Sequence, residues 1–156
     1  MRFWMSGVLS AVLWGMLLFG PGPAAAQTVI DGDTIDYKGM VLRLWGIDAP
    51  EKAQTCADGW AAGKAAADYL AQLMQGKTVT CEVKTVPGND KVHYGLCKAN
   101  GQDLSAAMAS AGLAWSLPEL TADYTVQDSN AQYMLRGANA HPCNKAWDWR
   151  NAQLKK

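Results

Sequence analysis

The chain has 156 residues, and its 14 Lys and Arg residues balance its 14 Asp and Glu residues, so the formal net charge at pH 7 is zero. This length favours one domain. The neutral balance excludes the long basic track with which many proteins hold nucleic acid, so any contact with nucleic acid should be local and sensitive to salt.

The first 26 residues form a candidate export signal. Arg2 precedes a nearly unbroken apolar run at residues 3–20, two prolines interrupt the run, and alanines at 24–26 offer small residues for cleavage. We predict a signal peptide at residues 1–26 and a mature domain at residues 27–156, which loses the charge of Arg2 and keeps all 14 acids. An uncleaved membrane anchor is the alternative, because the apolar run approaches the length that spans a bilayer.

A β-hairpin is predicted at the start of the mature domain. Residues 29–30, 34–37 and 40–47 are rich in β-branched and aromatic side chains. Between them, Lys38 and Gly39 fit a two-residue turn, since glycine readily adopts positive φ.

The register of that hairpin matters for chemistry. With the two-residue turn, Thr34 rather than Asp33 lies opposite Arg43. Arg43 and Asp48 differ by an odd number, so a regular strand would point them to opposite faces. A bulge or bend at Gly46 is the feature that could bring them to one side.

The four cysteines all follow the export signal, and an even number in an exported chain predicts two disulfides. A second hairpin is predicted around the turn cluster at residues 87–90. Centring its turn on the third residue of that cluster puts Cys81 opposite Cys97, where antiparallel strands suit a disulfide. Cys56 and Cys143 then pair by elimination. Zinc is the alternative, but no two cysteines have the close spacing of a zinc site.

Three helices are predicted from apolar periodicity and their end signals. They span residues 57–75, 103–111 and 125–136. Asp58 and Asp103 are candidate caps of the first two, and Thr125 with Asp128 resembles a capping box at the third. Together the elements predict a mostly β protein with helices, of the α+β class: a five-stranded OB-fold barrel capped by about three helices.

Residues 29–51 gather five acidic side chains around one arginine, Arg43. The acids are Asp31, Asp33, Asp36, Asp48 and Glu51. Burying ionised carboxylates is costly unless a cation or hydrogen-bond donors meet them, so this stretch predicts a site that holds a cation. The alternative is a solvated acidic loop in which Arg43 forms a surface ion pair of little consequence.

The spacing of this stretch resembles the thermonuclease family, the staphylococcal-nuclease-like OB-fold nucleases. The matching pieces are Asp31-Gly32-Asp33-Thr34, the run from Arg43 to Glu51, and Asn100-Gly101-Gln102-Asp103-Leu104. The ending Trp147-Asp148-Trp149-Arg150 also resembles the exported bacterial members. The resemblance extends over residues 28–150.

The resemblance implies a set of site residues. Asp33, Asp48 and the backbone carbonyl of Ala49 would bind Ca²⁺, which prefers hard oxygen ligands. Glu51 would act as the general base toward the attacking water. Arg43 would bind the phosphate more strongly as negative charge builds in the transition state.

The implied function is that of a Ca²⁺-dependent endonuclease that hydrolyses phosphodiester bonds of DNA or RNA. The substrate would be single-stranded nucleic acid or a breathing duplex, and the product would carry a 3′-phosphate. We expect a periplasmic or secreted monomer with no stable membrane association after signal cleavage.

One departure from the family affects catalysis. Its members carry a second catalytic arginine in the later hairpin, where this chain has Val92 or, in another alignment, Leu96. Lys91 or His93 could substitute, but lysine lacks the bidentate fork of arginine. Because removing one such donor commonly costs about 10²–10³ in rate, the alternative function is a catalytically degenerate OB-fold module that binds nucleic acid or Ca²⁺ without turnover.

Overall fold

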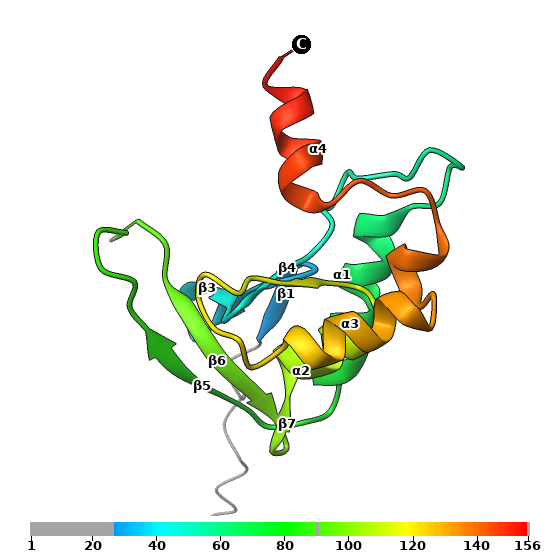
Figure 1. Ribbon diagram of the computed structural model, residues 1–156. Coiled ribbons are helices and arrows are strands. Elements are labelled where there is room, and N and C mark those ends of the chain that lie inside the picture. Colours follow the sequence, from blue (N-terminus) through cyan, green and yellow to red (C-terminus); the bar gives the residue numbers. More distant parts are fainter. Residues whose placement is uncertain (1–26, 90, 156) are drawn as a thin grey trace, which may run out of the picture.

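The computed structural model describes residues 27–89 and 91–155 of the chain, so the predicted signal peptide at 1–26 lies outside the described residues. A main sheet packs against helices, and a short two-stranded sheet lies beside it (Figure 1). The strands are β1 Thr28–Asp31, β2 Thr34–Tyr37, β3 Met40–Leu44, β4 Ile47–Asp48, β5 Val79–Lys84, β6 Tyr94–Ala99, β7 Gln102–Asp103 and β8 Trp115–Ser116. The helices are α1 Ala62–Met74, α2 Leu104–Ser110, α3 Thr125–Tyr133 and α4 Ala146–Gln153, with a 3₁₀ helix, η1, at Gly137–Ala140.

The main sheet has the strand order β1-β2-β3-β6-β5, and β7 pairs with β6. All these pairs are antiparallel except β3 with β6, which is parallel. The α+β class is therefore confirmed, and the order is consistent with an OB fold. The sheet is not closed into a barrel in the part of the chain that the structure describes, because its edge strands β1 and β5 do not pair.

The first hairpin has the predicted turn. Lys38 and Gly39 have φ values of 56° and 84°, the positive values that a two-residue hairpin turn requires. The carboxylate of Asp36 accepts a hydrogen bond of 2.7 Å from the backbone N–H of Gly39. The resulting register pairs Thr34 with Arg43, as predicted.

Both predicted disulfides are present. Cys81 and Cys97 are direct partners across β5 and β6, with their Cα atoms 4.0 Å apart. Cys56 and Cys143 form the second bridge, which joins positions 87 residues apart. All four cysteines are therefore oxidised and the zinc alternative is wrong.

Two predicted helix caps are wrong and one is confirmed. The first helix begins at Ala62 rather than near residue 57, and Asp58 instead accepts a hydrogen bond from the backbone N–H of Trp60 and lies 2.7 Å from a ring nitrogen of His141. The proposed capping box at α3 is absent, because Asp128 binds the backbone and hydroxyl of Ser116 instead. The cap of α2 is confirmed, because Asp103 accepts a hydrogen bond of 3.0 Å from the N–H of residue 106.

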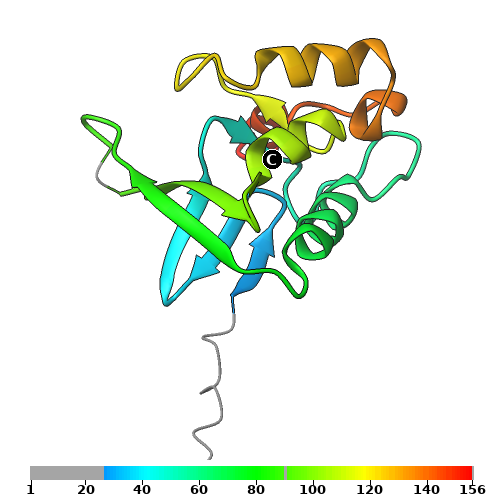
Figure 2. The same cartoon turned by 90° about the horizontal axis from the view of Figure 1, so that it is seen from below.

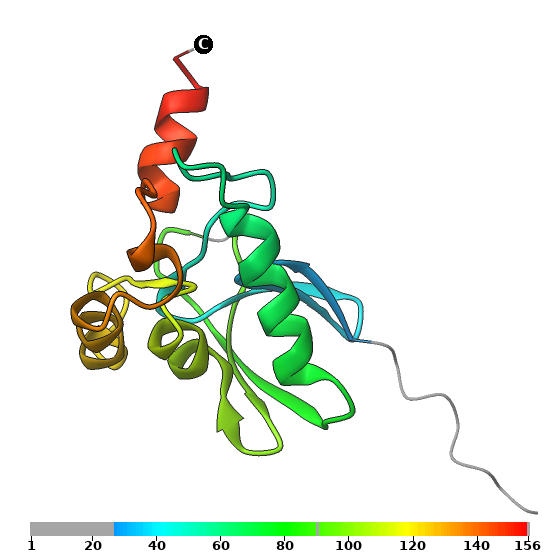
Figure 3. The same cartoon turned by 90° about the vertical axis from the view of Figure 1, so that its right-hand side faces the viewer.

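The main core lies between the sheet and the helices. Its fully buried side chains include Ile35, Leu42, Leu44, Leu70, Leu104 and Met108. Figure 3 shows α1 packed beside the sheet, and Figure 2 shows α1 and α3 in different places around it. Both Figures 1 and 2 show the loop end of the β5–β6 hairpin projecting beyond the helices.

Helix α4 was not among the predicted helices. It stands at one end of the molecule, away from the turn between α1 and β5 (Figures 1 and 3). Its first residue, Ala146, is fully buried in a small second core with Trp115 and Ala138, against which Trp147 packs. Of the helices in the described ranges, none is long and apolar enough to cross a membrane.

Candidate active site

The acid-rich stretch folds so that Arg43 meets two buried carboxylates. Its Nη2 atom donates to Asp33 Oδ2 and to Asp48 Oδ1, each over 2.8 Å. Asp33 is 4% exposed and Asp48 is 1% exposed, whereas the side chain of Arg43 keeps 31% of its surface accessible. The solvated-loop alternative is therefore wrong, since two of the acids are buried and paired.

Asp33 is held in place by its own turn. Its Oδ1 accepts a hydrogen bond of 2.7 Å from the Thr34 hydroxyl, and its Oδ2 accepts one of 3.1 Å from the backbone N–H of Ala49. The turn also packs closely on α1, because a Cβ added at Gly32 would lie only 2.6 Å from the Cβ of Ala66. These contacts explain why the sequence needs a small residue between the two aspartates.

Asp48 reaches the same place through a bend at Gly46, as predicted. Gly46 has a φ of 73°, and a side chain there would collide with Thr121 and Tyr124. After the bend the chain leaves the main sheet, and β4 pairs with β8 instead. The bend cancels the odd spacing between Arg43 and Asp48, so both side chains can meet.

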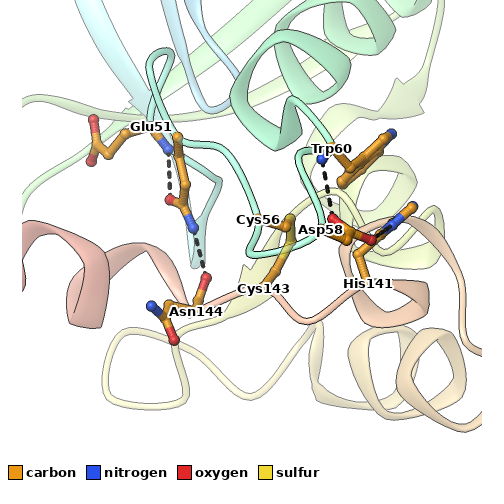
Figure 4. The surroundings of a disulfide bond; sticks show 8 residues. Glu51, Cys56, Asp58, Trp60, His141, Cys143 and Asn144 are labelled. Atoms are coloured by element: carbon orange, nitrogen blue, oxygen red, sulfur yellow. Dashed lines mark hydrogen bonds and ion pairs between the residues drawn. A yellow bond between two sulfur atoms is a disulfide. The ribbon is translucent and has the colours of Figure 1, made fainter.

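Glu51 lies three residues after Asp48, in a loop that is held by hydrogen bonds and close packing with neighbouring segments. Gln54, which is 1% exposed, accepts a hydrogen bond of 3.2 Å from the N–H of Glu51 and donates one of 2.6 Å to the carbonyl of Asn144 (Figure 4). A Cβ added at Gly63 would overlap the carbonyl oxygen of Glu51, so glycine lets the start of α1 approach this loop. The side chain of Glu51 is 29% exposed and is accessible to water.

The residue that sequence reasoning missed is Arg150 of α4. Its Nη2 donates to Asp48 Oδ2 over 2.7 Å, and its Nη1 donates to Asp48 Oδ1 over 3.0 Å and to Glu51 Oε1 over 2.5 Å. A signal existed in the sequence: the predicted bridge from Cys143 to Cys56 brings the chain seven residues before Arg150 close to the loop that follows Glu51. The last four of those seven residues lie in α4, where they span only about 6 Å.

The two arginines are held firmly in their charged forms. Burial by itself lowers the pKa of Arg43, but the charges and hydrogen bonds of Asp33 and Asp48 outweigh it and raise that pKa. Hydrogen bonds to Asp48 and, to a smaller extent, to Glu51 raise the pKa of Arg150. Both guanidiniums therefore remain donors at any working pH.

Negative charge nevertheless exceeds positive charge at the site. Two guanidiniums face the three carboxylates of Asp33, Asp48 and Glu51. Burial raises the pKa of nearby Asp31, and the charges of Asp33 and Glu51 raise it further. This excess is what a bound cation would neutralise.

The oxygen atoms of the site are of the kind that Ca²⁺ prefers as ligands. No group of three His, Cys, Asp or Glu side chains in the described residues is close enough to hold a metal by itself. Asp33 Oδ2 and Asp48 Oδ1 converge on the same nitrogen of Arg43, and the backbone of Ala49 adjoins both. Ca²⁺ takes six to eight hard oxygen ligands, of which waters and substrate supply several. Two carboxylates and one carbonyl would therefore suffice as the protein's share.

The later hairpin lies beside Arg43 but adds no arginine. Strand β6 pairs in parallel with β3, and the backbone N–H of Arg43 donates to the carbonyl of His93 over 2.9 Å. Lys91, Val92 and His93 line a surface hollow together with Arg43. In the part of the chain that the structure describes, neither Lys91 nor His93 bonds to the acids of the site.

The fold and the site together define an OB-type protein with an arginine–carboxylate centre. The family profile described as staphylococcal nuclease homologue matches residues 41–141. The chain belongs to the staphylococcal nuclease homologue family, as the resemblance predicted. Family membership supports a nuclease, a hydrolase that acts on nucleic acid.

Individual relatives agree with the family match. The chain is 30% identical over 131 residues, which are 79% of this chain and 81% of the relative, to a protein of Escherichia coli named an uncharacterized endonuclease. It is 33% identical over 117 residues, 67% of this chain and 60% of the relative, to the succinoglycan biosynthesis protein ExoI of Rhizobium meliloti (strain 1021).

Proposed function

We propose that this protein is a Ca²⁺-dependent endonuclease that hydrolyses phosphodiester bonds of DNA or RNA. The observation that carries the proposal is the convergence of two buried carboxylates, Asp33 and Asp48, on Arg43, with Glu51 close by, in a chain of the staphylococcal nuclease homologue family. Burying these carboxylates is costly, and with Glu51 they outnumber the two guanidiniums that face them, which supports a site for a cation.

Each residue has a role in this proposal. Asp33, Asp48 and the carbonyl of Ala49 would hold the ion, which when bound supplies positive charge that polarises a phosphoryl oxygen. Glu51 is partly exposed and accepts the proton of the attacking water. Arg43 binds a non-bridging phosphate oxygen.

Arg43 is suited to that role by its free donors. Only its Nη2 atom bonds to the acids, and its other guanidinium nitrogens have no hydrogen-bond partner among the described residues. A charge-assisted bond from these donors strengthens as charge accumulates on the phosphate, so the contact favours the transition state over the ground state.

We also propose that residues 1–26 are removed as a signal peptide and that residues 27–156 act as a monomer in the periplasm or outside the cell, without stable membrane association. The two disulfides support this location, since such bridges persist in oxidising compartments.

The second candidate function is a module that binds nucleic acid or Ca²⁺ without turnover. It is favoured by Val92, which lines the hollow beside Arg43 and which one of the two alignments places at the family's second arginine. The two functions differ in whether a bound phosphodiester is cleaved.

One assay separates them. The oxidised protein is incubated with single-stranded DNA and with RNA, in Ca²⁺ and in chelator, beside the variant Glu51→Gln. Cleavage that needs Ca²⁺ and is abolished in the variant is the expected result. Binding of Ca²⁺ or nucleic acid with no cleavage at high protein concentration would establish the module instead.

A further inference from the structure

The C-terminal helix is anchored to the loop that carries Glu51. Three contacts hold the chain just before Arg150. They are the disulfide from Cys143 to Cys56 and the hydrogen bond to the carbonyl of Asn144, both drawn in Figure 4, and the burial of Ala146. These contacts fix the start of α4 without any help from Arg150. The guanidinium of Arg150 is therefore delivered to the site by a support that is already in place.

Arg150 binds the two acids that matter most for the proposed chemistry. It forks onto both oxygens of Asp48, a proposed ion ligand, and reaches Glu51, the proposed base. Its side chain still keeps 36% of its surface exposed. Arg43 also donates to Asp48, so the buried carboxylate would stay paired with one guanidinium if Arg150 were absent, and a purely structural role is a weak explanation for the place of Arg150.

The positions of the two arginines indicate a shared ligand. Arg43 Nη2 and Arg150 Nη1 both donate to Asp48 Oδ1, so two guanidiniums from opposite ends of the chain approach one oxygen. In this structure the anion between the two guanidiniums is the carboxylate of Asp48. A phosphodiester presents the same kind of paired, negatively charged oxygens as a carboxylate, and it matches the arginine fork.

We propose that Arg150 is the second phosphate-binding arginine of this site, supplied by α4 instead of by the β5–β6 hairpin. The inference rests on the proposed nuclease function and assigns it a further catalytic residue. Arg43 and Arg150 hold the scissile phosphate between them, and Arg150 stabilises the negative charge that develops on its oxygens as water attacks and the P–O bond to the leaving nucleotide breaks. The hollow beside Arg43 that Val92 lines then needs no arginine.

The proposal is tested with the full chain exported to the periplasm of a bacterial host, so that both disulfides form. Three variants are compared with the wild type: Arg150→Ala, Arg150→Lys and the control Arg136→Ala. Arg136 is a matched control because it is exposed and, among the described residues, its side chain donates only to the carbonyl of Ser110, away from the acids. The measurements are kcat and KM on single-stranded DNA, the affinity for thymidine 3′,5′-bisphosphate in Ca²⁺ by calorimetry, and the unreduced Tm.

We expect Arg150→Ala to lower kcat by about 10²–10³ and to weaken the bisphosphate by about 10–100-fold, with little change in Tm. Arg150→Lys keeps the charge but not the bidentate fork, so its kcat and its affinity should lie between those of the wild type and those of Arg150→Ala. It should also stay folded if the alanine variant does not. Arg136→Ala should match the wild type within about twofold, as a surface substitution.

The outcomes separate this inference from the nuclease proposal. A wild type that never cleaves but binds the bisphosphate through Arg150 overturns the nuclease proposal and the catalytic role of Arg150, and supports its role in binding phosphate. Unchanged kcat and affinity in Arg150→Ala and Arg150→Lys overturn the inference, as does a wild type that binds no bisphosphate. Higher activity or tighter binding in Arg150→Ala also overturns it, because Arg150 would then be an inhibitory latch on Glu51 and Asp48.

Discussion

Asp48 is the carboxylate that binds both arginines of the site. It is 1% exposed and accepts hydrogen bonds from both Arg43 and Arg150, so its negative charge is compensated inside the protein. The same oxygens are the ones that the proposed ion would use. If the proposed function holds, Asp48 therefore contributes both to the stability of the folded chain and to the affinity for Ca²⁺.

Replacing Asp48 by Asn should separate these two contributions. We expect Asp48→Asn to abolish the rise in Tm that Ca²⁺ gives the wild type, since ligand binding to the native state alone stabilises it. In chelator the variant should lose about 1–3 kcal/mol, because a buried acceptor of charged donors becomes neutral. Thermal unfolding with and without Ca²⁺ measures both effects.

The matched control is Asp68→Asn, which removes an exposed carboxylate paired only with Lys64. It should change the free energy of unfolding by less than about 0.5 kcal/mol and keep the full Ca²⁺ response. A Ca²⁺-dependent rise in Tm that survives in Asp48→Asn would exclude Asp48 as a ligand.

Gly63 is a second single position on which the site depends. A methyl group there would overlap the carbonyl oxygen of Glu51, which is backbone and has no flexible end to move away. We expect Gly63→Ala to lower kcat more than about tenfold, since a base displaced by 1 Å loses much of its effect, and to cost about 1–3 kcal/mol from overpacking. The control is Lys64→Ala, at the next residue, whose side chain is exposed. It should leave kcat and the free energy of unfolding near their wild-type values. Equal losses in the two variants would refute the steric explanation.

Local patterns made the first hairpin and Arg43 predictable, whereas α4 was not. The turn at Lys38 and Gly39 and the bend at Gly46 are set by residues next to them in sequence. Helix α4 has a weak apolar pattern and no side-chain cap, and tertiary contacts through Cys143 and Ala146 hold its start. Arg150 lies 102 residues after Asp48, so only a correct disulfide assignment could have pointed to their meeting.

The two disulfides should have different effects on activity because they brace different elements. Removing the Cys56–Cys143 bridge by the double substitution to Ser should lower kcat, because it loosens the start of α4 and the loop of Glu51 together. Removing the Cys81–Cys97 bridge should leave kcat within a few-fold, because β5 and β6 remain paired by their backbone ladder.

The two bridges should differ less in their effect on stability than in their effect on activity. In the chain-entropy model the long loop closed by Cys56–Cys143 contributes about 4–5 kcal/mol and the short loop closed by Cys81–Cys97 about 3 kcal/mol. Urea unfolding and steady-state assays at a temperature where both variants are folded measure the two properties independently. An equal loss of kcat in both variants would mean that the bridge at α4 does not position the site.

At the level of the whole molecule, the site is assembled from distant parts of the chain. The carboxylates come from the turn after β1, from β4 and from the loop that follows it, one guanidinium from β3 and the other from the C-terminal helix. Among the described residues, the β5–β6 hairpin supports the backbone of Arg43 and lines a hollow beside it, but it adds no guanidinium. If α4 supplies the second arginine, the site does not lack one, and an arginine in the hairpin at position 92 is not needed.

Restoring an arginine to the hairpin tests that division of labour. We expect Val92→Arg to change the kcat of the wild type by less than about threefold, since Arg150 already supplies the charge, and to raise kcat of the Arg150→Ala background by about tenfold or more. The reason is that Val92 lines the same hollow as Arg43, so a guanidinium at 92 would lie near a phosphate bound to Arg43.

The comparison of the two backgrounds carries the argument, because a general gain from added positive charge would be similar in both. Such a general gain would also fall steeply as salt is raised, since it acts through long-range attraction. A gain of about 10² in the wild-type background, at moderate salt, would show that the molecule lacks its second arginine after all and that Arg150 only pairs with acids. A gain confined to the Arg150→Ala background would show that either α4 or the β5–β6 hairpin can supply the second guanidinium to one phosphate.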